Sequence, residues 1–124
     1  MQEILPFLMF QGNAEEAMNH YTSLIEGSEI TEVTHSEDGK VLRAIFSLKG
    51  QKFMCIDSSI QHDFTFTPSF SIFVICDSKE EVTNLYEQLS TDGEVLMPLG
   101  EYPFGTFAWI TDRFGISWQF NDQK

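Results

Sequence analysis

Two stretches of the chain repeat apolar residues every three or four positions, the spacing of an amphipathic helix. The first begins near Asn13 and ends at Gly27, and the second begins near Ser78 and ends after Leu89. Each starts with a residue that can cap a helix, and a glutamate follows three positions later, as in a capping box. Gly27 is typical of a helix C-terminus. The sequence therefore predicts one helix in each half of the chain.

Apolar runs rich in β-branched and aromatic residues flank both helices and predict strands. We expect the strands at residues 4–10, 29–35, 41–48 and 52–57 of the first half, and at residues 70–76, 94–97, 104–110 and 116–121 of the second. The pair Asp38-Gly39 predicts a hairpin turn. Residues 100–105, with Pro98 and Pro103 close by, predict a structured loop. Each half thus reads β-α-β-β-β.

An offset of 65 residues aligns the two halves with each other. It pairs Glu15 with Glu80, Asn19 with Asn84, Tyr21 with Tyr86, Ile45 with Ile110, Gly50 with Gly115 and Phe53 with Trp118. Because the same offset holds at both ends of the unit, we infer an internal duplication. The 124 residues form a single domain, with a first module at about 1–60, a linker at about 58–68 and a second module at about 66–124.

The charge of the chain argues against nucleic acid and anionic membranes as partners. Its net charge is −12, and the seven Lys and Arg residues are scattered rather than clustered, whereas phosphate binding needs clustered cations. Cys55 and Cys76 lie in predicted strands, so we expect buried, reduced thiols. No signal peptide or membrane span is visible. We therefore expect a cytoplasmic protein.

Several predicted strands are apolar on both faces. Residues 4–10 show no polar alternation, and residues 70–76 carry only Ser71 as a polar side chain. A helix covers one face of a sheet, and the other face normally turns polar. The second face is therefore covered too, by a partner subunit, by the sheet's own curvature or by a bound apolar ligand.

Four segments resemble the PhnB-like branch of the vicinal oxygen chelate superfamily, which includes glyoxalase I, bleomycin-resistance proteins and extradiol dioxygenases. They are residues 10–17 with Tyr21, residues 71–77 with Glu80-Glu81, residues 105–109 and residues 112–119. The resemblance implies an α+β fold in which two βαβββ modules form a curved mixed sheet around a cleft, usually in a homodimer. Members of this branch often carry a ubiquinone-precursor methyltransferase label. We do not expect that activity, because the chain lacks a Gly-x-Gly turn for the methyl-donor cofactor.

Metal-bearing relatives take four ligands from the first and last strands of each module. By the resemblance, these positions correspond here to Pro6, Met54, Ser71 and Gln119. Proline has no donor, and methionine and serine are poor ligands for divalent ions, which leaves only the amide of Gln119. We therefore expect neither a metal ion nor another cofactor.

The sequence favours a metal-free binding module for a small apolar or aromatic molecule, and does not decide whether any reaction is catalysed. We expect no catalytic residue. By alternation along the strands, the cleft should be lined by Leu8, Met54, Ser71, Phe73 and Gln119, with Trp109 as an aromatic wall. Two alternatives stay open: a lyase, isomerase or dioxygenase of the superfamily, and a homodimer whose own aromatic residues fill the cleft.

Overall fold

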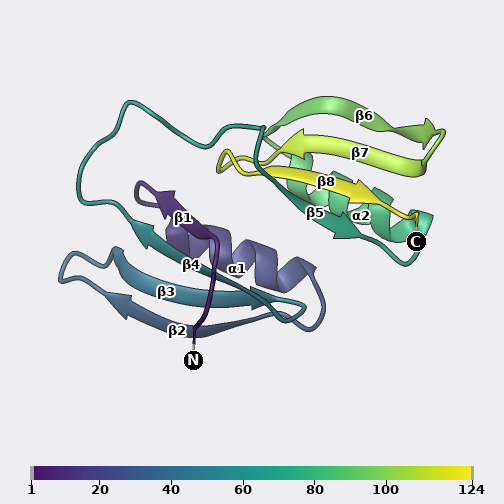
Figure 1. Cartoon of the computed structure of the whole chain (residues 1–124). Coiled ribbons are helices and arrows are strands. Elements are labelled where there is room, and N and C mark those ends of the chain that lie inside the picture. The colour runs from purple at the N-terminus through teal and green to yellow at the C-terminus, as the bar shows by residue number, and fades with distance from the viewer. Residues whose placement is uncertain (1, 124) are drawn as a thin grey trace. The chain divides into compact units, whose positions relative to one another are not determined.

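The computed structural model describes residues 2–123, and the chain forms two compact units, Met1–His62 and Asp63–Lys124 (Figure 1). The boundary lies inside the segment expected to be the linker. Residues 58–70 contain no helix or strand. Each unit is described here by itself.

Both units have the order β-α-β-β-β, as the duplication predicts. The first contains β1 (Phe7–Phe10), α1 (Ala14–Leu24), β2 (Glu29–His35), β3 (Val41–Leu48) and β4 (Gln51–Asp57). The second contains β5 (Ser71–Ile75), α2 (Lys79–Ser90), β6 (Glu94–Tyr102), β7 (Gly105–Thr111) and β8 (Ser117–Asn121). The sheet orders, β1-β4-β3-β2 and β5-β8-β7-β6, are equivalent. In each, the first strand runs parallel to the last and the other pairs are antiparallel.

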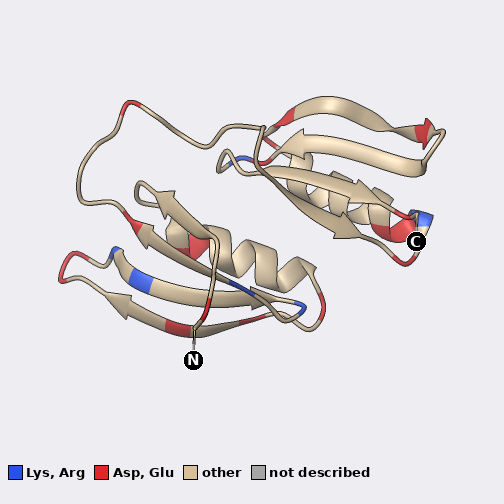
Figure 2. Ribbon diagram, in the orientation of Figure 1, with Lys and Arg blue, Asp and Glu red and all other residues tan. Residues whose placement is uncertain are grey.

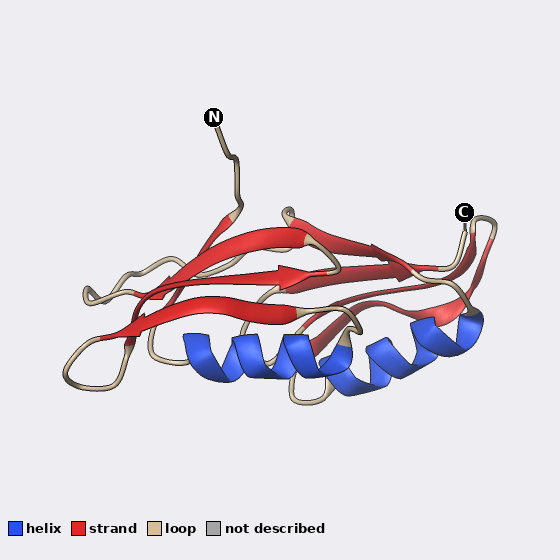
Figure 3. Ribbon diagram, turned by 90° about the horizontal axis from the view of Figure 1, so that it is seen from below, coloured by secondary structure: helices blue, strands red, loops and turns tan. Residues whose placement is uncertain are grey.

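Each helix covers one face of its own sheet, and the core lies between them (Figure 3). In the first unit, Phe46 and Cys55 are buried on this face together with Met18 and Tyr21 of α1. The second unit buries Ala108, Ile110, Trp118 and Phe120 of the sheet with Val82, Leu85 and Leu89 of α2. Apolar burial of this kind is the main stabilising contribution to such a fold. The opposite face of each sheet, which we call the helix-free face, has no helix of its own unit against it.

The two helices begin differently, although their sequences begin alike. Ser78 Oγ accepts a hydrogen bond from the Glu81 amide at 3.1 Å, as expected of an N-cap. Asn13 makes no side-chain cap, so the expected capping box at α1 is wrong. Asp57 of β4 takes its place, because its Oδ1 accepts from the amides of Gly12 and Ala14 at 2.8 and 2.9 Å.

A buried carboxylate also fixes the turn between β7 and β8. Asp112 Oδ1 accepts hydrogen bonds from the amides of Phe114 and Ile116, and its Oδ2 accepts from the indole of Trp118 at 2.8 Å. Gly115, at φ +96°, donates to the Asp112 carbonyl. This turn sets the register of β8 and therefore decides which of its side chains reach the helix-free face.

The third strand of the second module is longer than expected. β6 continues to Tyr102, which pairs with Gly105, so the predicted loop at residues 100–105 is largely strand. Register shifts between Val95 and Gly100 accommodate Pro98 in this edge strand, where a missing amide hydrogen is tolerated.

The offset between the modules is 65 residues only in part of the unit. Phe7 pairs with Met54, and Phe73 pairs with Gln119, so the first strands are related by 66 residues rather than 65. Ile45 pairs with Met54, whereas Trp109 pairs with Gln119. The predicted match of Ile45 with Ile110 is therefore wrong by one position. A one-residue slip changes the face of every side chain in a strand.

Candidate functional site

A row of four side chains crosses the helix-free face of the β5–β8 sheet. The cross-strand pairs are Phe73 with Gln119, Gln119 with Trp109, and Trp109 with Met97. Directly opposed residues share a face and approach closely enough to interact. The row therefore places an aromatic ring on each side of a single amide. Phe73 is 52% exposed, and Trp109 and Gln119 are half-buried.

Four of the six residues expected to line a ligand site lie together on this face: Ser71, Phe73, Trp109 and Gln119. Met54 lies on the helix-free face of the other sheet, opposite Phe7. Leu8 does not share that face, because it pairs with Cys55 and is buried on the helix-covered face. Its expected inward orientation is wrong, since the first strands are offset by 66 residues and Leu8 corresponds to Val74 rather than to Phe73.

A chain of hydrogen bonds joins the polar members of the site. Trp109 Nε1 donates to Ser117 Oγ at 2.9 Å, and the hydroxyls of Ser117 and Ser71 are 2.6 Å apart. Gln119 Nε2 donates to Ser71 Oγ at 3.2 Å. We call these four residues the polar relay. Both hydroxyls also lie 3.4 Å from the carbonyl oxygen of Pro68. The relay orients the indole and the amide relative to each other.

Ser117 and Met97 belong to the site but were not predicted. Ser117 precedes Gln119 by two positions, so strand alternation from Gln119 could have found it. Met97 was hidden by the register shifts of β6. Its place opposite Trp109 depends on those shifts, which the sequence does not reveal.

The site carries no ionisable side chain on three of its strands. Within the described residues, the helix-free faces of β5, β7 and β8 present only apolar, hydroxyl and amide groups. An aromatic cluster of Tyr102, Phe104 and Phe107 continues the apolar surface along β6 and β7, with ring centroids 5.1–5.6 Å apart. By contrast, the first sheet carries the ion pair of Arg43 with Glu32 on its helix-free face.

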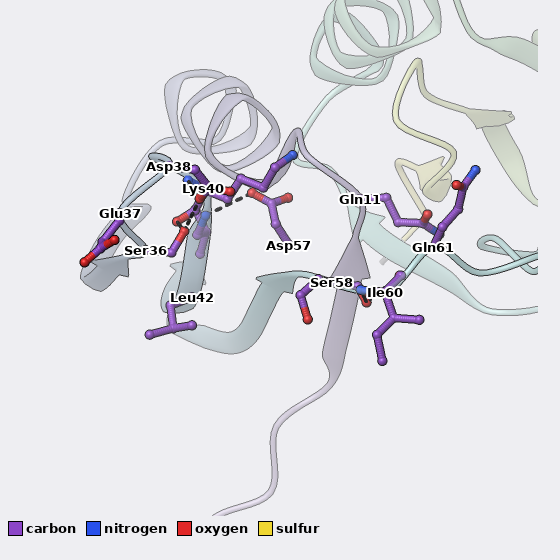
Figure 4. Close-up of a pocket in the computed structure, with 12 residues that line it drawn as sticks. Gln11, Ser36, Glu37, Asp38, Lys40, Leu42, Asp57, Ser58, Ile60 and Gln61 are labelled. Atoms are coloured by element: carbon purple, nitrogen blue, oxygen red, sulfur yellow. Dashed lines mark hydrogen bonds between the residues drawn. The ribbon is translucent and has the colours of Figure 1, made fainter.

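The first unit contains a hollow of about 780 Å³ beside the β2–β3 hairpin. Figure 4 shows Asp57 between the hairpin residues and the glutamines Gln11 and Gln61. The two oxygens of Asp57 accept hydrogen bonds from main-chain amides, including that of Val41 at 3.0 Å. Asp38 accepts from the Ser36 hydroxyl and the Lys40 amide. These carboxylates hold the local backbone together, and we assign no ligand to the hollow.

The side chains at the implied metal positions do not fit a divalent ion. The helix-free faces of β1 and β4 carry Phe7, Met9, Met54 and Ile56, and those of β5 and β8 carry hydroxyl, aromatic, aliphatic and amide groups. Divalent ions of this superfamily's kind need imidazole and carboxylate donors. Among residues 2–123, no three His, Cys, Asp or Glu side chains gather into a possible metal site. We therefore derive no chemistry through a metal.

The remaining surface gives little support to other macromolecular partners. Lys and Arg occur singly along the ribbon (Figure 2), and the net charge is −12. In the described part of the chain, no helix is long and apolar enough to cross a membrane.

Several solved structures are similar to this chain. A PhnB protein from Bacillus cereus is 49% identical, with a TM-score of 0.93, and the match covers 97% of this chain and 98% of that one. Protein PA1353 from Pseudomonas aeruginosa is 28% identical over the whole of both chains, with a TM-score of 0.81. The fosfomycin resistance protein FosX from Listeria monocytogenes, solved with Mn(II), is 13% identical with a TM-score of 0.64; the match covers 100% of this chain and 95% of that one, and shows the fold alone.

The family follows from a match along nearly the entire chain. No curated protein sequence matches it. The sequence model of the 3-demethylubiquinone-9 3-methyltransferase family matches residues 2–121. With the structural similarity to PhnB and FosX, this confirms the α+β fold of the glyoxalase and bleomycin-resistance proteins. The chain belongs to this PhnB-like family, within the vicinal oxygen chelate superfamily.

Proposed function

We propose that the chain is a binding protein for small apolar or aromatic molecules, that it acts without a metal ion, and that it works as a homodimer. The observation that carries the proposal is the row of Phe73, Gln119, Trp109 and Met97 on a face that no helix of its unit covers. Binding sites for small molecules combine apolar walls with a few placed polar groups. The aromatic row supplies the walls, and the polar relay supplies the polar groups.

Stacking on this face would give the ligand affinity and orientation. Phe73 and Trp109 flank Gln119, so a flat ring could contact either aromatic side chain while its edge meets the amide. An aromatic pair contributes roughly 0.5–1.5 kcal/mol beyond the burial of its surface. Met54, on the equivalent face of the first sheet, stays a predicted ligand contact.

Exposed apolar side chains on edge strands support the homodimer. β1 and β5 each lie at the edge of their own sheet. They carry Phe7 and Phe73, which are 53% and 52% exposed, and β5 also exposes Ile75. Unpaired strand edges with apolar side chains favour pairing with another chain. A second copy of this chain is the partner we propose, in the cytoplasm, where the thiols of Cys55 and Cys76 stay reduced.

The enzyme alternatives find less support in these residues. A metal-dependent lyase, isomerase or dioxygenase needs donors that the helix-free faces lack. A methyltransferase needs a site for its methyl donor, and the sequence has no Gly-x-Gly turn for one. Activity that requires an added metal and is lost when Gln119 is replaced would put the enzyme reading in place of ours.

Replacing Phe73 tests whether the face binds a ligand or is an interface filled by the protein itself. A set of small aromatic molecules is screened by thermal shift, and the tightest is titrated by calorimetry into wild type, Phe73→Ala and Leu42→Ala. Leu42 is the control, because it is 61% exposed and lies in the other unit. We expect Phe73→Ala to weaken binding by about 5- to 30-fold, from lost stacking and burial, and Leu42→Ala to leave it unchanged.

The alternative of a filled, ligand-free cleft makes the opposite prediction. In that case Phe73→Ala lowers the melting temperature or dissociates the dimer, and no aromatic molecule in the set raises the melting temperature of the wild type. That result would overturn the proposed function.

A further inference from the structure

The polar relay ends at a group that has no partner. Gln119 uses its Nε2 to reach Ser71, while its Oε1 makes no hydrogen bond within residues 2–123. This oxygen lies between Phe73 and Trp109 in the cross-strand row. Sealing an unpaired amide oxygen under an apolar surface is unfavourable. The geometry therefore favours an occupant that brings a polar group of its own to Gln119.

We propose, resting on the function proposed above, that the ligand is an uncharged flat aromatic molecule bearing one hydroxyl or carboxamide group, and that the amide of Gln119 recognises this group. The ring lies against Phe73 or Trp109, and the polar substituent meets the free end of the relay. This names the class of ligand for the site, which the apolar row alone does not.

The two serines let the relay adapt to either kind of substituent. A hydroxyl offers one donor and two acceptor positions. With Gln119 Nε2 donating to Ser71, the amide presents its oxygen, which accepts a hydrogen bond from a ligand hydroxyl. If the amide turns by half a turn, the donors run from Trp109 Nε1 through Ser117 and Ser71 to Gln119 Oε1. The amide then presents its NH₂ group, which donates to a ligand carbonyl.

Charge separates this class from acids of the same shape. A buried carboxylate needs a cationic partner or several donors, and β5, β7 and β8 place no ionisable side chain on this face. The net charge of −12 also repels anions. The site therefore discriminates against an aromatic acid even when its ring fits.

Four naphthalene probes that share one ring system test the proposal: 2-naphthol, naphthalene-2-carboxamide, 2-methylnaphthalene and 2-naphthoate. Each is titrated by calorimetry at pH 7 into wild type, Gln119→Met and Gln88→Met. The last is the matched control, because Gln88 is exposed on α2, on the other side of the sheet. Circular dichroism melting confirms that each variant is folded.

We expect 2-naphthol and the carboxamide to bind wild type about 3- to 10-fold more tightly than 2-methylnaphthalene, the range for one net hydrogen bond, and 2-naphthoate to bind most weakly. In Gln119→Met the preference over 2-methylnaphthalene should disappear, while Gln88→Met should retain it. Ser71→Ala, which cuts the relay, should reduce the preference.

The outcomes separate this inference from the proposed function. Equal affinity for the three neutral probes would overturn the inference and leave an apolar binder, as would a preference that survives in Gln119→Met. Tightest binding of 2-naphthoate would overturn the uncharged class. Absence of binding by all four probes to folded protein would overturn both proposals.

Discussion

At the scale of single residues, equivalent positions of the two units carry different chemistry. Phe7 and Phe73 occupy the same place in their sheets, but their cross-strand neighbours are Met54 in one unit and Gln119 in the other. The next position is Ile45 in the first unit and Trp109 in the second. The duplicated backbone thus holds a polar relay in only one copy, and we place the recognition of a ligand's polar group there.

The two cysteines make the stability depend on pH in the alkaline range. Burial raises the pKa of Cys55 from 9.0 to about 12, and the nearby charge of Asp57 adds to this. Burial, followed by the charge of Glu81, raises the pKa of Cys76 by a similar amount. Unfolding frees both thiols to ionise near pH 9, so their contribution is complete below pH 9 and is lost as the pH rises from 9 towards 12.

In urea unfolding between pH 7 and pH 10.5, each thiol should lower the free energy of unfolding by about 1.4 kcal/mol per pH unit above pH 9. The double variant Cys55→Ala/Cys76→Ala provides the comparison, because lysines and tyrosines titrate equally in both proteins. Its profile should be flatter than that of the wild type. Identical slopes above pH 9 would show that the native thiols ionise normally.

At the scale of elements, similar sequence signals lead to different local solutions. α2 is capped by its own Ser78, and Glu81 Oε1 returns to accept from the Asp77 amide at 2.7 Å. α1 begins at amides held by Asp57, which comes from a strand 43 residues further along the chain. A local pattern predicts a local cap, but it does not reveal a competing acceptor that the fold brings in.

This difference predicts unequal costs for two similar substitutions. Ser78→Ala should lower the free energy of unfolding by about 1 kcal/mol, the usual contribution of a serine cap. Asn13→Ala should cost clearly less, because Asn13 makes no side-chain cap. Urea unfolding of both variants beside the wild type measures this. Equal losses would mean that Asn13 caps α1 in solution.

The sequence predicted element types better than faces. Helix spacing, the Asp38-Gly39 turn and the duplication are local or repeated signals, and the structure confirms the elements they predict. Ser71, Phe73, Trp109 and Gln119 were placed together, because β5, β7 and β8 keep simple alternation. Leu8 was assigned to the wrong face, since the added residue before β5 leaves no mark in the composition of either strand. The relay through Ser117 needs the pairing of three strands and could not be inferred from one strand's pattern.

At the scale of the whole molecule, the central claim is a PhnB-like homodimer that binds an apolar ligand without a metal ion. The fold is shared with FosX, which was solved with Mn(II). The helix-free strand faces of this chain, however, present Met54, Ser71 and Gln119 rather than imidazoles and carboxylates. The shared fold therefore does not carry the metal with it, and the donor set decides the matter.

Native mass spectrometry of the untagged protein, incubated with Mn(II) and then desalted into volatile buffer, tests this claim most directly. The account predicts an ion with twice the mass of one chain and no stoichiometric metal, for wild type and Gln119→Met alike. A dimer that retains one Mn(II) per chain, and loses it in Gln119→Met, would contradict the account and make the metal-dependent enzyme the better reading.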